Sequence, residues 1–232
     1  MATGLLYDVH GNLPALEAVL RDARDTNIDR WVLGGDYASF GAWPAEVIAR
    51  MESLPDAVWI RGNWDRWQGG DRADMLPGAE LQEALRNAVD ALGPERVDRL
   101  AALPGSYRAG DVLFCHGAPD SDMESFLPDP SEHDEELLAG VGAGCVVFGH
   151  THLPVDRQQN GVHLVNPGSV GLPFDGDPRA SWAVLHDDGR AERRRVAYDI
   201  DVAAGTLIER FGDTPLIQGT INRLRRATFN GE

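Results

Sequence analysis

Short apolar runs that each end in a small group of glycine and polar residues constrain this chain more than any other feature. The clearest run, residues 145–148, is followed by Gly149-His150-Thr151-His152. Four apolar residues bounded by glycines predict a buried strand, and strands of open α/β sheets collect ligands at their carboxyl ends. In extended backbone, residues two apart face the same side, so we expect His150 and His152 to face one pocket. Two imidazoles suit a transition metal, but other residues must complete the site.

The same pattern occurs at four earlier points in the chain. The apolar runs at 5–7, 31–33, 57–60 and 112–115 lead into Asp8-x-His10, Gly35-Asp36, Gly62-Asn63-x-Asp65 and His116-Gly117, respectively. A helix with Pro14 in its first turn is predicted between the first two runs, because apolar residues recur there at helical spacing. The β-α-β order implies a right-handed crossover and parallel strands, whose carboxyl ends meet at one edge of the sheet.

The rest of the chain adds helices and hairpins to this frame. Helices are predicted at 44–54, 202–211 and 216–226. Two more, divided at Gly93-Pro94, are expected in a helical insertion at about 66–105 that covers the site or mediates dimerisation. Hairpins are expected at 107–115, around Asn160-Gly161 and around 188–189, which makes the second half antiparallel or mixed. The acidic, proline-broken segment 120–136 is interpreted as a solvated surface excursion.

Composition limits the classes of partner. The chain has 21 Arg and no Lys against 37 Asp and Glu, a formal charge of -16 over 232 residues. This charge repels nucleic acid duplexes and anionic membranes. The length suits a single domain, 1–232. Cys115 and Cys145 lie in apolar runs, as buried free thiols do in a reducing compartment, and no leader-like or membrane-length apolar segment is seen. We therefore expect a cytoplasmic protein, and the oligomeric state is left open.

In order, the five motifs resemble those of the calcineurin-like metallophosphoesterase superfamily, in particular its small bacterial phosphodiesterase-type members. The likeness spans positions 8–152 and extends to 169 through Asn166-Pro167-Gly168-Ser169. Each dipeptide alone is common, whereas five motifs in family order are specific. The resemblance implies an α/β fold, a four-layer αββα sandwich with two mixed β-sheets.

The resemblance also implies two divalent metal ions and their ligands. Asp8, His10 and His152 would hold the first ion, Asn63, His116 and His150 would hold the second, and Asp36 would bridge them. Catalytic roles are implied for Asp36, Asn63 and His150. The mixed oxygen and nitrogen ligands, without thiolate, favour Mn as the first expectation, with Fe, Zn, Co or Ni also compatible.

The implied reaction is hydrolysis of a small phosphate-ester substrate. A pair of metal ions can clamp the attacking and leaving oxygens of an in-line displacement at phosphorus, and a metal-bound hydroxide is the nucleophile. We therefore expect a dimetal-dependent phosphoesterase that acts on phosphodiesters or activated phosphate esters. The alternative enzyme activity is hydrolysis of a nucleotide or dinucleoside polyphosphate. The alternative of another class is a non-catalytic metal-binding scaffold, because some family members, such as a retromer subunit, serve in protein assembly.

One position departs from the family pattern. Many members have a histidine after the Asn of the third motif, where it acts as a general acid toward the leaving oxygen, and this chain has Trp64 there. An indole cannot pass a proton, so an acid that typically contributes about 10²–10⁴-fold is missing. This predicts a preference for substrates with good leaving groups. Trp64 is interpreted mainly as a packing residue, with stacking on a base or aryl group as its functional alternative.

Residues near or outside the motifs receive structural interpretations first. Asn12 is expected to cap the first helix, and Asn166 and Ser169 to stabilise a turn. Arg61 and Arg66 could clamp phosphate, but arginines in solvent are more common. Three histidines lie outside the motifs: His133, His163 and His186. For each of them, contact with substrate is a minor alternative to a structural role.

Overall fold

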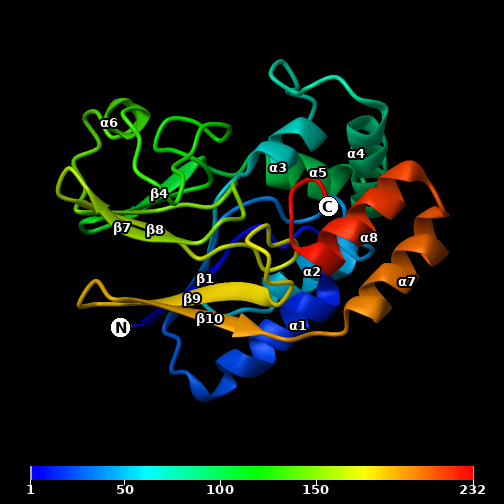
Figure 1. Ribbon diagram of the computed structural model, residues 1–232, viewed down its shortest axis with the longest axis horizontal. Helices are drawn as coiled ribbons and strands as arrows, with labels where there is room; N and C mark the ends of the chain where they lie inside the picture. Colours follow the sequence, from blue (N-terminus) through cyan, green and yellow to red (C-terminus); the bar gives the residue numbers. More distant parts are fainter. Residues whose placement is uncertain (1, 232) are drawn as a thin grey trace.

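The computed structural model describes residues 2–231, whose ten strands form two mixed sheets. The first sheet has the order β10-β9-β1-β2-β3, and the second has the order β4-β5-β6-β8-β7 (Figure 1). The strands of the first sheet are β1 Ala2–Leu6, β2 Arg30–Leu33, β3 Ala57–Trp59, β9 Ala180–His186 and β10 Ala191–Val196. Those of the second are β4 Ser106–Ala109, β5 Val112–Cys115, β6 Cys145–Val147, β7 Val155–Gln159 and β8 Val162–Asn166. The predicted α/β class with two mixed sheets is confirmed.

Parallel strands form the centre of both sheets. β1, β2 and β3 pair in parallel, with Leu5 beside Val32, and β5, β6 and β8 do the same in the second sheet. Antiparallel hairpins lie at the edges, and that of β7 and β8 turns at Asn160-Gly161, where both residues have positive φ (49° and 79°). The parallel strands explain why the polar motifs after β1, β2, β3, β5 and β6 collect at one edge of the two-sheet core.

The two sheets face each other across an apolar layer. Leu5, Tyr7 and Val32 from the first sheet pack with Phe114 and Val147 from the second, all nearly inaccessible to solvent. The other face of the first sheet is covered by α1 Leu13–Asp22, α2 Pro44–Glu52 and α5 Pro94–Ala101. Burial on both faces accounts for the continuous apolar runs in the sequence.

The outer face of the second sheet carries only a short helix and a loop. α6 His133–Leu137 and the preceding segment cover it, and Phe126 is completely buried with its ring centroid 5.0 Å from that of Phe148. Asp134 is also buried and pairs with Arg157 at 2.6 Å. The interpretation of residues 120–136 as a solvated excursion is therefore wrong in part. The acidic composition of this segment does not reveal that the apolar side chain of Phe126 and the paired carboxylate of Asp134 cover this face of the sheet.

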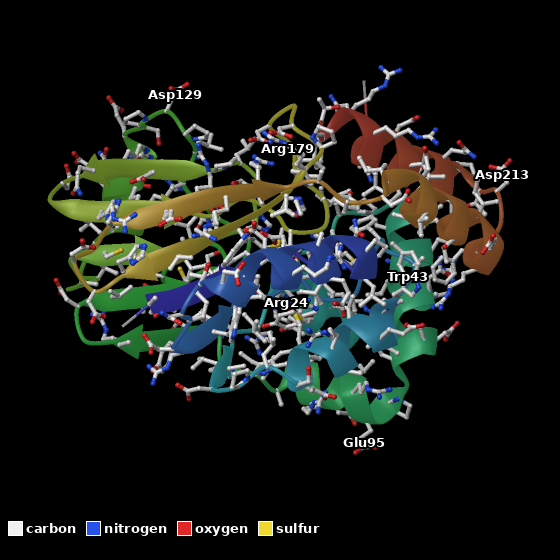
Figure 2. All side chains as sticks on the ribbon, turned by 90° about the horizontal axis from the view of Figure 1, so that it is seen from below. Arg24, Trp43, Glu95, Asp129, Arg179 and Asp213 are labelled. Carbon is white, nitrogen blue, oxygen red and sulfur yellow. The ribbon has the colours of Figure 1, made fainter. Side chains whose placement is uncertain are left out.

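The remaining helices gather at one end of the molecule (Figure 1). They are α3 Asn63–Gln68, α4 Ala79–Leu92, α7 Ile200–Phe211 and α8 Pro215–Arg226, and a 3₁₀ turn at Ala23–Asp25 follows α1. Leu85 of α4 packs with Leu207 of α7 and Leu224 of α8, whereas Leu92 and Val97 join the core under the first sheet. Charged side chains such as Glu95 point outward (Figure 2). Among residues 2–231, no helix has both the length and the apolar character needed to cross a membrane.

Candidate metal centre and family membership

Five of the seven predicted ligands lie on left-handed backbone. Asp8, His10, Asp36, His150 and His152 have φ values of 54°, 47°, 56°, 66° and 58°. Our expectation that an extended strand brings His150 and His152 together is therefore wrong, because β6 ends at Val147 and tight turns aim the two rings. Non-glycine residues in this region cost about 1–3 kcal/mol each, and such strain clusters at functional sites.

The first group of ligand atoms joins Asp8, His10 and His152. Nε2 of His10 lies 3.1 Å from Nε2 of His152, and Nε2 of His152 lies 3.6 Å from Oδ1 of Asp8. All three residues are buried and their ligand atoms lie within 4.8 Å of one another. Oδ1 of Asp8 accepts no hydrogen bond from the described residues, so this buried oxygen has its lone pairs directed at the group.

The second group lies on the other side of Asp8. Nε2 of His116 lies 3.5 Å from Oδ2 of Asp36 and 4.0 Å from Oδ1 of Asp8. Oδ1 of Asn63 lies 3.1 Å from that same nitrogen and 3.1 Å from Nδ1 of His150. All seven side chains singled out in the sequence therefore meet in one buried cluster.

Two carboxylates stand between the groups. The resemblance gives the bridging role to Asp36, whereas the two groups whose ligand atoms lie within 4.8 Å of one another share Asp8. Oδ2 of Asp36 is also central, because it lies 3.8 Å from Nε2 of His10 and 3.5 Å from Nε2 of His116. Its other oxygen, Oδ1, accepts a hydrogen bond from the backbone N–H of Trp64 at 2.9 Å. Oδ2, which lies near both His10 and His116, is therefore the atom of Asp36 available to both groups.

Backbone carbonyls orient two of the imidazoles. Nδ1 of His116 donates to the carbonyl of Gly34 at 2.8 Å, and Nδ1 of His152 donates to the carbonyl of Leu172 at 2.6 Å. A carbonyl can only accept, so the proton is assigned to Nδ1 in each ring and Nε2 keeps its lone pair when the ring is neutral. Such outer hydrogen bonds are the usual support of metal-binding histidines.

Asp65 of the third motif, to which the sequence assigns no catalytic role, holds the Asp36 turn. Oδ2 of Asp65 accepts hydrogen bonds from the backbone N–H groups of Asp36 at 2.9 Å and Gly62 at 2.8 Å. Asp65 is completely buried in the first turn of α3. Its side chain both caps that helix and holds the neighbouring loop that contains Asp36. Gly62 is required by close approach: a Cβ there would overlap Oδ1 of Asp36.

The pKa values of the histidines in the cluster are shifted in two opposite directions. Burial lowers the pKa of His10 to about 4 and that of His150 to about 4, and it lowers the pKa of His152 in the same direction. At neutral pH these rings are uncharged, which is the form that binds a metal. Burial also opposes charge on His116, but the carboxylates of Asp36 and Asp8 outweigh it and raise the pKa of His116 to about 10.

The two central carboxylates also have perturbed pKa values. Burial raises the pKa of Asp8 to about 8, and the neighbouring charge of Asp36 adds to this effect. Burial acts in the same direction on Asp36, but the charge and hydrogen bond of His116 outweigh it, so the pKa of Asp36 lies below its usual range. At neutral pH Asp8 and His116 therefore each keep a proton beside the ionised Asp36. A divalent cation could replace these two protons, so the donor set fits metal ions.

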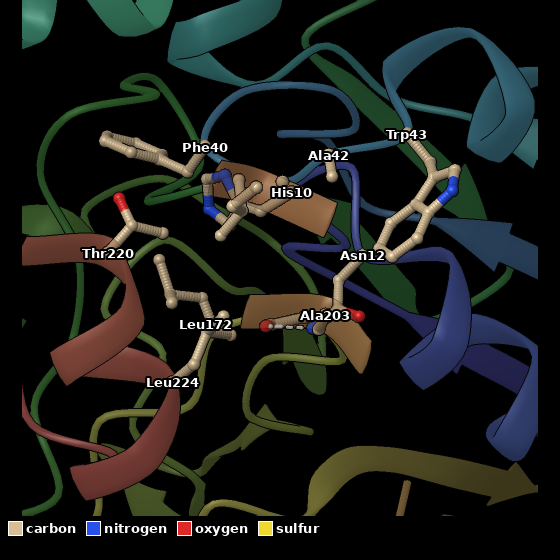
Figure 3. A pocket seen from close by; sticks show the side chains of 12 residues that line it. His10, Asn12, Phe40, Ala42, Trp43, Leu172, Ala203, Thr220 and Leu224 are labelled. Carbon is tan, nitrogen blue, oxygen red and sulfur yellow. Dashed lines mark hydrogen bonds between the residues drawn. The ribbon is translucent and has the colours of Figure 1, made fainter. Parts of the chain in front are cut away.

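A small void lies beside His10 (Figure 3), and none of the other six candidate ligands lines it. It has a volume of about 10 Å³ and apolar walls that include Phe40, Leu172 and Leu224. A void of this size has room for one water at most, so it is no substrate site. Nδ2 of Asn12 donates to the carbonyl of Gly171 at 2.9 Å beside it, and the amide oxygen of Asn12 caps α1, as predicted.

The other candidate residues lie outside the cluster. His133, His163 and His186 pair with surface carboxylates. Arg66 is held by Asp122 and Asp74, and Nη1 of Arg61 donates to the carbonyl of Ala101. Oγ of Ser169 donates to the carbonyl of Asp8 at 2.7 Å, and Oδ1 of Asn166 accepts from the N–H of Gly168 at 2.8 Å. Asn166 and Ser169 therefore stabilise the turn, as predicted.

The sequence analysis missed several residues that border the cluster. Phe40, Met123, Phe174, Arg223 and Phe229 line a cavity that also includes His10 and His150. Phe40 has a φ of 73°, which is rare for an aromatic residue, but nothing in the sequence marks it. Met123, Phe174 and Phe229 come from loops and from the end of the chain, and their only sequence signal is apolar character in otherwise polar segments. Arg223 lies in α8 and belongs to no motif.

Comparison with known proteins agrees with the cluster. Residues 1–190 match the family model described as the calcineurin-like phosphoesterase superfamily domain. Phosphodiesterase YfcE of Escherichia coli (strain K12) is 28% identical over 192 residues, which cover 78% of this chain and 85% of the relative. The 3',5'-cyclic adenosine monophosphate phosphodiesterase CpdA of Pseudomonas aeruginosa is 30% identical over 219 residues, covering 77% of this chain and 78% of that protein.

A solved structure is similar over the whole fold. The crystal structure of a metallophosphoesterase from Sphaerobacter thermophilus superposes with a TM-score of 0.82 and 27% identity, covering 98% of this chain and all of that chain. The family match includes every motif that supplies the buried Asp and His groups. Sequence, fold and site therefore agree that this chain belongs to the calcineurin-like phosphoesterase superfamily.

Proposed function

We propose that this protein is a dimetal phosphoesterase that hydrolyses phosphodiesters or activated phosphate esters. The observation that carries the proposal is the convergence of two buried Asp/His groups, which share Asp8 and lie beside Oδ2 of Asp36. Strained left-handed backbone at most of these positions supports a functional rather than a packing role. The names of the relatives YfcE and CpdA, both phosphodiesterases, support diesters as the substrate class.

The proposed ligand sets are those that the family resemblance implies, and the two groups of atoms support them. Asp8, His10 and His152 would hold one ion. Asn63, His116 and His150 would hold the other, with Asp36 between them through Oδ2. Two divalent ions there would supply an activated water and would neutralise charge on the phosphate oxygens. Mn is the expected metal, because it suits the carboxylate and amide oxygens of this set, while the imidazoles also suit Fe, Zn, Co or Ni.

The chain's own residues would orient the reaction. The hydrogen bonds of His116 and His152 to backbone carbonyls keep their Nε2 atoms directed at the centre. Asp65 keeps the Asp36 turn in place, and Asn63 directs its Oδ1 between His116 and His150. These restraints fix where a phosphate group would bind before any substrate arrives, which lowers the cost of reaching the transition state.

Trp64 predicts which esters are cleaved well. Its indole is almost completely buried against Phe40 and Trp67, and it can donate no titratable proton to a departing oxygen. We therefore expect kcat for esters with good leaving groups to exceed kcat for esters whose leaving oxygen needs a proton. At equal binding, the ratio should be about 10²-fold or more. Equal kcat values for aryl and alkyl phosphate esters would contradict this expectation.

The first experiment compares bis-p-nitrophenyl phosphate with p-nitrophenyl phosphate. The protein is stripped of metal, and Mn, Ni, Co, Zn or Mg is restored separately. Turnover that depends on added metal and favours the diester supports the proposed function. Asp36→Ala should lower both the bound metal and the turnover, whereas His186→Ala, at a surface ion pair far from the cluster, should lower neither. Two bound ions without turnover on any ester would support the scaffold alternative.

A further inference from the structure

A cavity of about 380 Å³ opens directly onto the candidate metal centre. His10, Asp36, Asn63, His150 and His152 form its polar floor, so the cavity and the cluster share one space. Its other walls are almost entirely apolar, and they are lined by Phe40, Trp64, Trp67, Leu76, Leu81, Met123, Leu172, Phe174 and Phe229. A cavity with a polar end and apolar walls suits a ligand that has both a polar group and an apolar group.

Aromatic rings build the walls nearest the centre. Phe174 stacks on the imidazole of His152, with ring centroids 4.4 Å apart and planes 17° apart. Phe40, another lining residue, lies edge-on to Trp64, with centroids 4.7 Å apart. Phe40 is held there by a left-handed backbone conformation, and Figure 3 shows its ring beside His10. A cavity lined by several aromatic rings favours an aromatic guest, because ring edges and faces attract one another.

The mouth of the cavity exposes apolar side chains to solvent. Leu76 and Phe229 are each 68% exposed, more than any other large apolar residue that the structure describes. They come from the segment before α4 and from the segment after α8, which turns back toward α3 (Figure 1). Two such residues on one rim mark a place where apolar surface would be covered by a ligand.

One cation, Arg223 of α8, lines the same cavity. Its guanidinium carbon lies 5.9 Å from the ring centroid of Phe40 and 5.8 Å from that of Phe229, and its Nε donates to the carbonyl of Phe229 at 2.9 Å. Among residues 2–231, no carboxylate forms an ion pair with Arg223, although Glu80 acts on it through space. Most arginines in this acidic chain do have such partners, as Arg225 has in Asp201. The two terminal nitrogens of Arg223 are thus available to an anion.

We propose that this cavity is a substrate subsite that binds an aromatic group of the phosphate ester against the aromatic wall that includes Phe40 and Phe174, with Arg223 pairing with its phosphate. The inference rests on the proposed function and names the substrate class: phosphate esters with an aromatic organic group. Arg223 is a positioning residue, because the guanidinium can hold a phosphate oxygen that faces away from the ligand cluster. Phe229 would cover the aromatic group from the solvent side.

The test measures binding of two ligands that have no ester bond to cleave. Calorimetry on the Mn-loaded protein compares phenylphosphonate with methylphosphonate, which differ in the aromatic group. We expect phenylphosphonate to bind about 10-fold more tightly or better, because its ring leaves water. Phe229→Ala should reduce this ratio about 3-fold or more, whereas Ile208→Ala, an exposed apolar residue on α7, should leave it unchanged. Equal affinities of the two phosphonates would overturn the aromatic subsite.

A second pair of variants tests the arginine. Arg223→Gln should weaken binding of both phosphonates about 10-fold and raise KM more than it changes kcat, because the lost contact positions phosphate. Arg225→Gln removes the same charge from the same helix and should change neither quantity. Equal effects of the two variants would show that Arg223 acts only through net charge, and would overturn its role.

Failure of the inference is distinguishable from failure of the proposed function. If esters are hydrolysed with restored metal but phenylphosphonate has no advantage, the phosphoesterase function stands and the aromatic subsite falls. If phenylphosphonate binds better and Arg223→Gln weakens it, but no ester is hydrolysed with any metal, the subsite stands as a binding site and the proposed function falls.

Discussion

At the scale of single residues, the site depends on backbone shapes that most side chains avoid. Asp8, His10, Asp36, His150 and His152 all have positive φ. The sequence identifies these residues by type and order, but it does not show that they leave their strands through left-handed turns. The neighbouring glycines give a partial signal, because a Cβ at Gly149 would lie 2.6 Å from Oδ2 of Asp8. Their role is to let carboxylates approach the backbone closely.

Gly62→Ala should therefore remove the metal centre without unfolding the protein. The new Cβ would overlap Oδ1 of Asp36 and lie 2.5 Å from its backbone nitrogen, so the Asp36 turn has to move. We expect loss of at least one of two bound ions, measured by elemental analysis, with the circular dichroism spectrum retained. Gly205→Ala in α7 has open space around its Cβ and should keep the metal, with stability raised by about 0.5–1 kcal/mol. Full metal content in Gly62→Ala would refute this reasoning.

The thiols provide a second test at this scale. Burial raises the pKa of Cys115 well above its usual value and raises that of Cys145 to about 12. A raised thiol pKa means that the reactive thiolate is scarce at pH 8. We expect neither cysteine to react with Ellman's reagent in the folded protein, and both to react after unfolding in guanidinium. Rapid reaction of the folded protein at pH 8 would contradict this expectation.

At the scale of elements, α3 connects the metal centre with the loop that closes the second sheet. Arg66 on α3 forms a two-nitrogen pair with Asp122 at 2.7 Å, and it also pairs with Asp74 at 2.7 Å. Its side chain is only 11% exposed. α3 was not predicted from the sequence, since it is short and its buried positions include Asn63, Asp65 and Gln68. Site geometry, not apolar spacing, determines this helix.

Arg66→Met should destabilise the fold by about 3 kcal/mol, because it leaves the largely buried carboxylate of Asp122 without its partner. The guanidinium of Arg66 holds the pKa of Asp74 at about 2, below the model-compound value of 3.8. A depressed carboxylate pKa gives stability that is present above about pH 4 and is lost as the pH falls toward 2.

The wild-type advantage over Arg66→Met should therefore be constant from pH 8 to about pH 4.5 and should shrink at lower pH. Urea unfolding at a series of pH values measures it. Arg72→Met, in the neighbouring exposed segment, is the matched control, because among residues 2–231 the Arg72 side chain donates only to the carbonyl of Trp67. An advantage that grows as the pH falls below 4 would contradict the assigned sign.

At the scale of the whole molecule, two sheets and the C-terminal helices meet at the candidate metal centre. Its ligands come from the ends of β1, β2, β3, β5 and β6, so both sheets must be in place before the cluster exists. Bound metal would then stabilise the complete fold, because the unfolded chain cannot present these residues together.

Removal of metal should lower the melting temperature of the whole protein in one transition. At a free metal concentration about 1,000 times the Kd, the stabilisation is about 4 kcal/mol. We expect a chelator to lower the melting temperature by several degrees and Mn to restore it, measured by differential scanning calorimetry. In Asp8→Asn, which keeps the shape of the side chain but loses its charge, the chelator should have a much smaller effect. An unchanged melting temperature in the wild-type protein would count against a bound metal in the purified protein.

The sequence by itself determined the α/β class, the mixed sheets, most helices and hairpins, and the family. Each of these depends on local apolar periodicity, turn residues or the order of short motifs, which are all readable along one chain. The tertiary structure alone decided how the ligands are aimed, what Asp65 and Arg66 hold, and that Arg223 and Phe229 reach the centre. Those features depend on left-handed turns and on contacts between residues far apart in sequence, for which one sequence carries no local pattern.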